Sequence, residues 1–519
     1  MRIRHAARWA AVFALAIAAQ LAAEADLHGR IRQEASTPSI MRTMHMLTDV
    51  YGPRLTGSPN GRLAADWAIK TLAGWGLTNA HLEPWDFGHA GWVNERAIAQ
   101  IVAPLKDQLF VRAVAWTPGT NGTINAPAFA LTYPDRPTVA ELTNYLESVR
   151  SRVKGRIVLA GPPAAVAPKL EPRPARRDDE QLRRRYDPEA TPEPPRARQQ
   201  DNPRGAMTRG EVNSRVDQFL LEYGALARVN DAGREMGQIV AYNNTSYDPS
   251  RVVPTIVMRN EDYGRIARIL ADGTDVQLEL NVVNRTFPEG RTSYNAIAEI
   301  EGSDRRAEVV MLGGHLDSWH VATGATDNAI GCAVMMEAVR ILKALGVQPR
   351  RTIRIALWTG EEQGLLGSRA YVKEHFGTFE DPKNEFRSLV AYVNLDNGTG
   401  RVRGARVFGP AAAAEVVRRA LAPFSDLGVV GASAYARRIT GDTDSTSFNA
   451  AGLPGINFDQ DPIQYDSYTH HTSLDTYERI VEDDVKASAI VAAGLVYELA
   501  MRDERLPRFD RASMPAPGK

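Results

Sequence analysis

The chain has 519 residues, more than the roughly 250 to 300 at which a single hydrophobic core stops growing, so more than one domain is expected. Hydrophobic residues make up 44% and charged residues 24%, which excludes wholesale disorder. The formal net charge is zero, so there is no basic excess for nucleic acid or for an anionic membrane surface, and a small substrate is the favoured partner.

Residues 1–25 have the features of a secretory signal peptide. Three arginines precede an apolar stretch from about Trp9 to Ala23, which runs into the small-x-small site Ala23-Glu24-Ala25. Because the stretch is shorter than the roughly 20 residues that span a bilayer, we expect cleavage and no membrane anchor. The mature chain is expected to be exported, either to the periplasm or out of the cell. Cys332 is the only cysteine, which excludes an intramolecular disulfide.

Residues 26–111 are expected to form the first part of a main domain. Two helical patterns lie between Pro38 and Leu77, separated by the turn-rich GPRLTGSPNG. Short β-rich runs such as KGRIVLAG then predict an inserted β-rich domain over residues 112–284. Within it, residues 162–206 are rich in proline and charge and cannot bury enough apolar surface to order themselves, so we expect a mobile excursion there.

Strand and helix patterns alternate from Ser293 onward, so residues 285–505 are expected to complete the main domain and residues 506–519 to form a tail. Continuous apolar strands separated by amphipathic helices predict an α/β fold with a mostly parallel, mixed sheet between two helical layers. Ligand sites in such sheets lie beyond the carboxyl ends of the strands.

Side chains that can bind metal follow the strand ends. They are His315 and Asp317 at the end of the first strand, Asp327 in the loop after it, Glu361 and Glu362 after the second, Asp396 after the third, and His470 and His471 in a late loop. Mixed imidazole and carboxylate ligands suit zinc better than calcium or magnesium. One bridging carboxylate with two further carboxylates and two imidazoles would hold a pair of ions about 3.5 to 4 Å apart. The sequence therefore predicts a dinuclear site.

Each of these groups also has an ordinary structural interpretation. Asp327-Asn328 alone reads as a helix N-cap, and Glu361-Glu362 alone reads as a solvated helix start. Their joint placement at successive strand ends favours metal binding, because independent caps would have no reason to supply a complete set of nitrogen and oxygen ligands.

Five motifs, GGHLDSW, GATDNAIG, LWTGEEQGLLGS, VNLD and HHTSLDT, together resemble the co-catalytic di-zinc aminopeptidase family, in the branch that contains carboxypeptidase Q. The resemblance runs from about Tyr51 to the last helix, and residues 112–284 resemble a protease-associated (PA) domain. It implies a zinc exopeptidase with two Zn²⁺ per chain that removes N-terminal amino acids from peptides or cleaves dipeptides. It also suggests a homodimer.

The resemblance further implies a role for each group. Asp327 would bridge the two ions, His315 and Asp396 would complete one, Glu362 and His471 would complete the other, Glu361 would be the general base, and Asp317 would orient His315. Glu361 would take a proton from water and pass it to the leaving amine.

Two substrate-side assignments stay open, the oxyanion donor and the role of Asp444. Several relatives have a tyrosine before the late ligand histidine that can stabilise the oxyanion, whereas this chain has His470 there. His470, Tyr468 and Tyr465 are therefore all candidate oxyanion donors. Asp444, in GDTDSTSF, is expected either to line the site or to form a structural turn.

Two other functions share this fold. One is glutaminyl-cyclase-like acyl transfer with one zinc, and the other is a non-catalytic, receptor-like homologue with none. A serine hydrolase is disfavoured because the sequence has no G-x-S-x-G elbow, and no HExxH helix indicates the other large class of zinc proteases. Metal stoichiometry separates the remaining alternatives.

Overall fold

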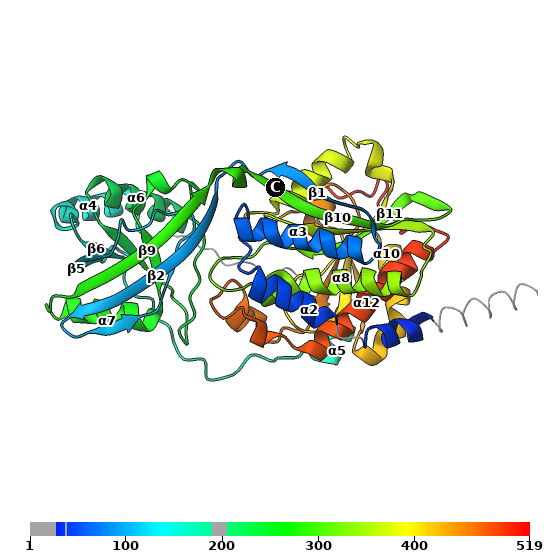
Figure 1. Cartoon of the computed structure of the whole chain (residues 1–519), viewed down its shortest axis with the longest axis horizontal. Coiled ribbons are helices and arrows are strands. Elements are labelled where there is room, and N and C mark those ends of the chain that lie inside the picture. The colour runs from blue at the N-terminus through cyan, green and yellow to red at the C-terminus, as the bar shows by residue number, and fades with distance from the viewer. Residues whose placement is uncertain (1–26, 37–38, 189–204, 519) are drawn as a thin grey trace, which may run out of the picture.

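The computed structural model describes residues 27–36, 39–188 and 205–518. Figure 1 shows these residues as two lobes joined by a pair of long strands. The expected signal peptide lies outside the described residues. Within the described ranges, no helix is long and apolar enough to cross a membrane.

The main lobe is built on a sheet with the strand order β1-β10-β12-β11-β13-β16-β14-β15. The strands are β1 Thr78–Asp86, β10 Thr292–Ile300, β11 Arg305–His315, β12 Arg351–Trp358, β13 Leu389–Asn394, β14 Val402–Phe408, β15 Gly431–Tyr435 and β16 Gly455–Gln460. The four central strands, β12, β11, β13 and β16, are parallel, whereas β1, β10 and β14 join through antiparallel pairs. The mixed α/β fold expected from the sequence is confirmed.

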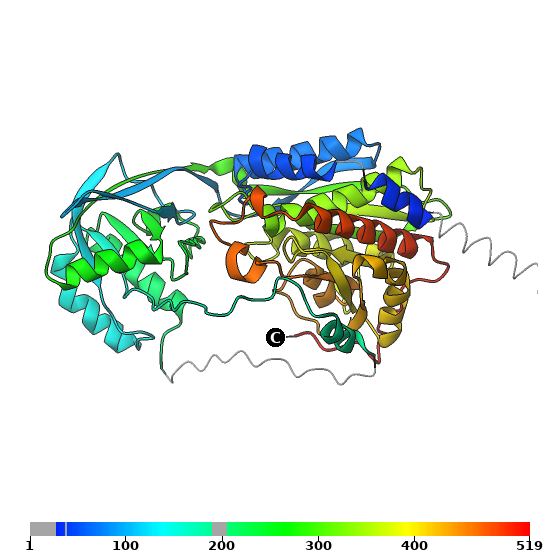
Figure 2. The same cartoon turned by 90° about the horizontal axis from the view of Figure 1, so that it is seen from below.

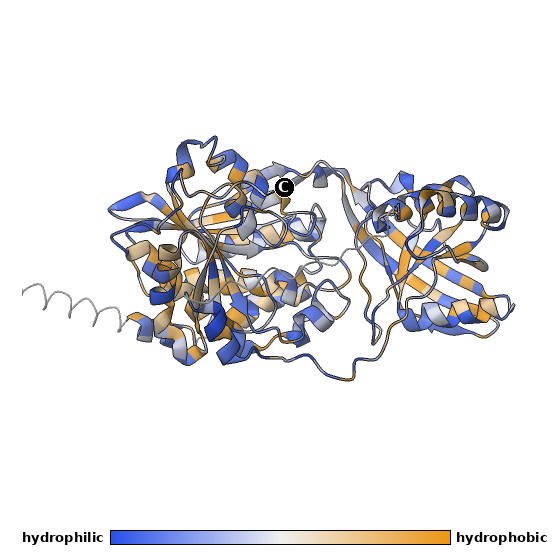
Figure 3. Cartoon of the chain, turned by 180° about the vertical axis from the view of Figure 1, so that it is seen from behind, coloured by the Kyte–Doolittle hydropathy of each residue, from blue (hydrophilic) through white to orange (hydrophobic). Residues whose placement is uncertain are grey.

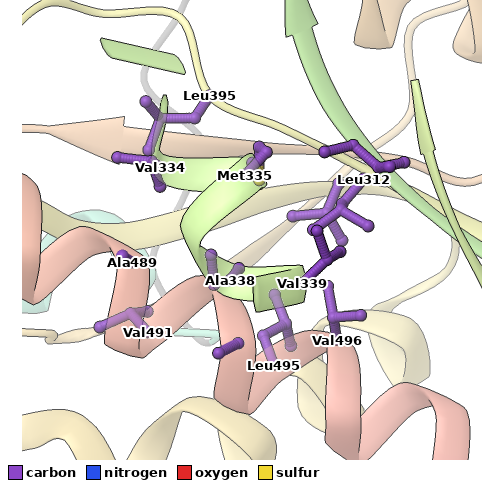
Figure 4. Close-up of a cluster of buried hydrophobic side chains, with 14 of the residues drawn as sticks. Leu312, Val334, Met335, Ala338, Val339, Leu395, Ala489, Val491, Leu495 and Val496 are labelled. Carbon is purple, nitrogen blue, oxygen red and sulfur yellow. The ribbon is translucent and has the colours of Figure 1, made fainter. Parts of the chain in front are cut away.

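Helices cover both faces of this sheet. They are α2 Ile40–His45, α3 Pro59–Gly74, α8 Ile330–Ala344, α10 Ala411–Leu421 and α12 Glu482–Met501 over one face, and α9 Leu366–Tyr371 and α11 Ser445–Ala450 over the other. Successive residues of β11 point to opposite faces, so Val310 and Leu312 join the core under α8 and α12 while Val309 and Met311 join the core on the other side. Figure 4 shows the first of these cores.

The second lobe, residues 91–287, lies in the chain between β1 and β10, and we call it the insert. Its sheet has the order β3-β2-β9-β5-β6-β7-β8-β4. The strands are β2 Gly91–Ala103, β3 Asp107–Leu109, β4 Val111–Ala113, β5 Ile124–Leu131, β6 Ile157–Ala160, β7 Ala227–Asp231, β8 Thr255–Met258 and β9 Gln277–Phe287, and the helices are α4 Val139–Val149, α6 Arg209–Glu222 and α7 Asn260–Ala271. Figure 3 shows hydrophobic residues gathered inside each lobe.

The insert starts earlier than the boundary expected at residue 112, because β2 and β3 pair into its sheet. The centre of β2 is the polar run Asn94-Glu95-Arg96, so this strand has no continuous apolar pattern. It is held by its long antiparallel pairing with β9, a tertiary contact that local sequence does not reveal. The resemblance of the insert to a PA domain stays a prediction.

The segment expected to be mobile, residues 162–206, is partly ordered. It includes a helix, α5 Asp179–Tyr186, that packs against β15 of the main lobe, and Figure 2 shows the connection running from the insert to this helix. The Tyr186 hydroxyl donates to Asp459 at 2.8 Å, and the Arg177 amide donates to Asp461 at 2.9 Å. Composition suggested mobility, but Arg176 pairs with Asp461 and Asp484 and Asp179 pairs with Arg403, all far along the chain. Residues 189–204 lie outside the described residues.

Candidate metal centre

The candidate ligands meet at one edge of the main sheet. His315 is the last residue of β11 and stands beside Trp358, the last residue of β12, while β13 runs parallel on the other side. Glu361 and Glu362 follow β12, and Asp396 follows β13. Because parallel strands end at the same edge, the chain delivers these side chains to one place.

Two groups of side chains share Asp327. In the first group, His315 Nε2 lies 3.2 Å from Asp327 Oδ1 and 3.3 Å from Asp396 Oδ1. In the second group, His471 Nε2 lies 3.2 Å from Asp327 Oδ2 and 2.9 Å from Glu362 Oε2. Asp327 thus turns a different oxygen toward each group. The peptide bond between Asp327 and Asn328 is cis.

The atoms that face these groups fit divalent cations. Among the described residues, His315 Nε2, Asp327 Oδ2, Glu362 Oε1 and Asp396 Oδ1 are buried and have no hydrogen-bond partner. Buried polar atoms are normally satisfied, and an ion is one of the few explanations for several such atoms converging. A small cleft bordered by Trp319, Asp327, Glu362 and His471 leads to them.

The electrostatics of the cluster also favour added positive charge. Burial raises the pKa of Glu361 and of Glu362, and neighbouring carboxylates, Asp396 for the first and Asp327 for the second, raise both further. Burial opposes the charge on Asp327 as well, but His471 and His315 keep its pKa below the ordinary value. Carboxylates therefore outnumber the cationic groups that could neutralise them.

Asp317 acts on both sides of the site. Its backbone carbonyl accepts from His315 Nδ1 at 2.9 Å, whereas its carboxylate is 3.6 Å from that nitrogen, too far for a good hydrogen bond. The carboxylate instead accepts the backbone N–H groups of Glu361 at 3.3 Å and Glu362 at 3.2 Å and the Thr56 hydroxyl at 3.1 Å. Asp317 thus orients His315 through its main chain and fixes the glutamate pair through its side chain.

Sequence reasoning gave three residues around the centre no role, and two of them contact candidate ligands or the turn that carries one. The Asp475 carboxylate accepts the backbone N–H groups of Thr326 at 2.6 Å and Asp327 at 3.1 Å. The Thr443 hydroxyl donates to Asp396 Oδ2 at 2.6 Å. Asp475 could have been found, because it follows the late histidines in HHTSLD, and Thr443 stands in GDTDSTSF beside Asp444, the residue that sequence reasoning considered instead.

Arg54 is a third such residue, and its side chain is fully buried. Its guanidinium donates to the backbone carbonyls of Leu316 at 2.6 Å, Thr323 at 2.8 Å and Gly324 at 2.9 Å. These carbonyls flank the loop between His315 and Asp327, so one arginine fixes the path of the chain between two candidate ligands.

The substrate-side candidates occupy different positions. His470 Nε2 is 4.0 Å from Asp327 Oδ2, and its ring packs at a tilt against His471 and Tyr465, with centroids 3.9 and 4.7 Å away. The Tyr468 hydroxyl instead contacts Met236 Sδ at 3.6 Å, in the insert. Asp444 is 1% exposed, and within the described part of the chain neither of its carboxylate oxygens has a hydrogen-bond partner.

Comparison with known proteins finds a family match for part of the chain and similar proteins over most of it. Residues 295–496 match the model of Peptidase family M28. Carboxypeptidase Q of Rattus norvegicus is 27% identical over 470 residues, which cover 89% of this chain and 85% of that protein.

Solved structures share the fold. A peptidase M28 precursor from Shewanella amazonensis superposes with a TM-score of 0.65 at 24% identity, covering 94% of this chain and 99% of that one. BSAP, a zinc aminopeptidase from Bacillus subtilis, gives a TM-score of 0.56 at 18% identity, covering 92% and 96%. The sequence matches and the fold together identify an enzyme, a metallopeptidase. The match of residues 295–496 to Peptidase family M28 and the likeness to carboxypeptidase Q confirm the resemblance drawn from the motifs.

Proposed function

We propose that this protein is a zinc-dependent exopeptidase that removes N-terminal amino acids from peptides or cleaves dipeptides. The observation that carries the proposal is the sharing of Asp327 by two groups, each with one imidazole and one further carboxylate. The zinc aminopeptidase with the same fold and the likeness to carboxypeptidase Q support it.

The donor set favours two Zn²⁺ per chain. His315 and Asp396 would hold one ion, Glu362 and His471 would hold the other, and Asp327 would bridge them, because its two oxygens face different groups. Zinc bound there would act as a Lewis acid on the scissile carbonyl and would lower the pKa of a bound water to about 7.

Glu361 is the proposed general base. Its Oε2 lies 4.0 Å from His315 Nε2, beside the first group, and the Asp317 carboxylate fixes its backbone. We propose that this carboxylate takes a proton from the attacking water and delivers it to the leaving amine. His470, which packs against His471, and Tyr465, which packs against His470, are better placed than Tyr468 to contact the developing oxyanion.

Replacing Glu361 by glutamine tests this mechanism. Glutamine keeps the size of the side chain but cannot accept the proton, so kcat for dipeptides and aminoacyl chromogens should fall by about 10²- to 10⁴-fold. Zinc content, measured by elemental analysis of the purified protein, should not change. The matched control is Glu374→Gln, an exposed glutamate paired with Lys383, which should retain full activity. Near wild-type turnover by the Glu361→Gln enzyme would refute the role of the base.

Zinc stoichiometry tests the alternatives. Two zinc ions per chain are expected, whereas a glutaminyl-cyclase-like enzyme would hold one and a receptor-like homologue would hold none. Chelation should abolish hydrolysis, and added zinc should restore it.

The resemblance to the carboxypeptidase Q branch also leads us to propose a homodimer, and the expected signal peptide leads us to propose an exported chain.

A further inference from the structure

One segment of the insert, residues 236–242, borders the candidate metal centre. Ile239 and Ser473 exchange two hydrogen bonds, from the Ile239 amide to Ser473 Oγ at 3.1 Å and from the Ser473 amide to the Ile239 carbonyl at 2.9 Å. These bonds fasten the insert to the loop that carries His471. The insert is therefore attached to one of the candidate ligand loops.

Tyr242 extends this contact to His471 itself. Its hydroxyl oxygen lies 3.2 Å from His471 Nδ1, and the two rings meet edge to face with centroids 5.6 Å apart. Trp319, which borders the cleft, packs edge to face against Tyr242 with centroids 5.1 Å apart and also contacts His471. The tyrosine ring thus packs against two residues of the main lobe that also contact each other.

The two nitrogens of His471 have different surroundings. Nε2 faces the carboxylates of Asp327 and Glu362, and Nδ1 faces the Tyr242 hydroxyl. A histidine that binds metal through Nε2 carries its proton on Nδ1, so Nδ1–H would donate to Tyr242. The phenol oxygen can accept this hydrogen bond, because it lies within reach of Nδ1 and carries free lone pairs.

We propose that Tyr242 is a positioning residue for His471. The insert would then contribute a residue to the surroundings of the metal centre. The hydroxyl fixes the tautomer and the ring plane of His471, as the backbone carbonyl of Asp317 does for His315. This inference rests on the proposed function, since it assumes that His471 binds zinc.

The test is zinc binding by the metal-free Tyr242→Phe protein. Phenylalanine keeps the ring and its packing but removes the acceptor, so the weaker zinc equivalent should bind about 10- to 100-fold less tightly than in the wild type. The titration is followed by calorimetry or with a chromogenic chelator as competitor. At saturating zinc, kcat should fall while KM changes little, because the hydroxyl acts on the ligand and not on the substrate.

The matched control is Tyr247→Phe, in the same insert. Tyr247 stacks on His89 with centroids 4.4 Å apart, and its variant should bind zinc like the wild type. Zinc affinities of Tyr242→Phe within twofold of wild type would overturn the inference. A rise in KM alone would also overturn it, because it would make Tyr242 a substrate contact. Failure of the wild-type protein to bind zinc would instead refute the proposed function, so the two failures are distinguishable.

Discussion

Asp475 organises the centre without belonging to either candidate ligand group. Both of its oxygens accept backbone N–H groups of the turn that carries Asp327, and the residue is 3% exposed. Burial, followed by the charge of Asp327, raises the pKa of Asp475 to about 7. Asp475 therefore places a second carboxylate beside Asp327, and its hydrogen bonds to the backbone hold Asp327 in its orientation.

Replacing Asp475 by asparagine should destabilise the protein. The amide group of asparagine has only one acceptor oxygen, so one buried N–H, of Thr326 or Asp327, would lose its partner. An unsatisfied buried group costs about 1 to 3 kcal/mol, and the free energy of unfolding measured in urea should fall by that amount. Asp466→Asn, an exposed change in the neighbouring loop, serves as the control. Equal stability of the two variants would contradict the role assigned to Asp475.

Residue types could be predicted from sequence, but orientation could not. The motif HHTSLD offers two adjacent histidines, and the family pattern selected His471. In the structure, His471 Nε2 is 2.9 Å from Glu362, while the His470 side chain is 43% exposed. Both imidazoles lie near Asp327, with His471 Nε2 at 3.2 Å and His470 Nε2 at 4.0 Å from Oδ2, and only the path of the loop brings His471 to Glu362 as well.

At the scale of elements, His375 connects parts of the main lobe. It follows α9, and its Nε2 lies 3.0 Å from Glu83 in β1 while its Nδ1 lies 3.2 Å from Glu385, which precedes β13. Its ring stacks on Tyr371. Hydrogen bonds to Glu385 and Glu83 raise the pKa of His375 to about 9. One protonated imidazole therefore holds the edge strand β1 to the layer that contains α9.

This raised pKa predicts a pH window for stability. The folded protein binds the proton more tightly than the unfolded chain, so the contribution is complete below about pH 6.5 and is lost as pH rises through about 9. The loss should be about 1 to 3 kcal/mol, since solvent screening reduces the ~1.4 kcal/mol expected per pKa unit. Denaturant unfolding of wild type and His375→Gln between pH 6 and 10 measures it. Parallel pH profiles for the two proteins would exclude this linkage.

The elements of the main lobe were largely predictable from the sequence. Strands β11, β12 and β13 are continuous apolar runs because both faces of the sheet are covered, and such runs are visible without a structure. The strand β2 was not predictable, because it is stabilised by its pairing with β9 and has no apolar pattern of its own. Its polar centre hid the true start of the insert.

At the scale of the whole molecule, α5 ties the chain that leaves the insert to the main lobe. Tyr186 is 3% exposed and packs against Gly404 and Gly431, where a larger residue would collide with its ring. Its hydroxyl donates to Asp459. The two lobes are thus connected by the strands β2 and β9 and, separately, by this helix.

Truncating Tyr186 should release α5. Removing a buried aromatic ring costs about 3 to 5 kcal/mol, which is large for a helix of 8 residues, so Tyr186→Ala should be cut by trypsin after Arg183, Arg184 or Arg185 much faster than wild type. Tyr186→Phe loses only the hydrogen bond, about 1 kcal/mol, and should stay largely protected. Mass spectrometry of timed digests identifies the cuts. Equal cleavage rates for the two variants would show that the ring does not hold the helix.

The sequence by itself determined the fold class and the resemblance to a peptidase family, because apolar strand patterns and strand-end ligands are local features and parallel strands must end at one edge. Only the tertiary structure decided that Asp327 faces two groups at once, that α5 docks on the main lobe, and that the insert brings Tyr242 to His471. Each of these is a contact between segments far apart in the chain. Local pattern does not encode such contacts, since they depend on how the packed lobes meet.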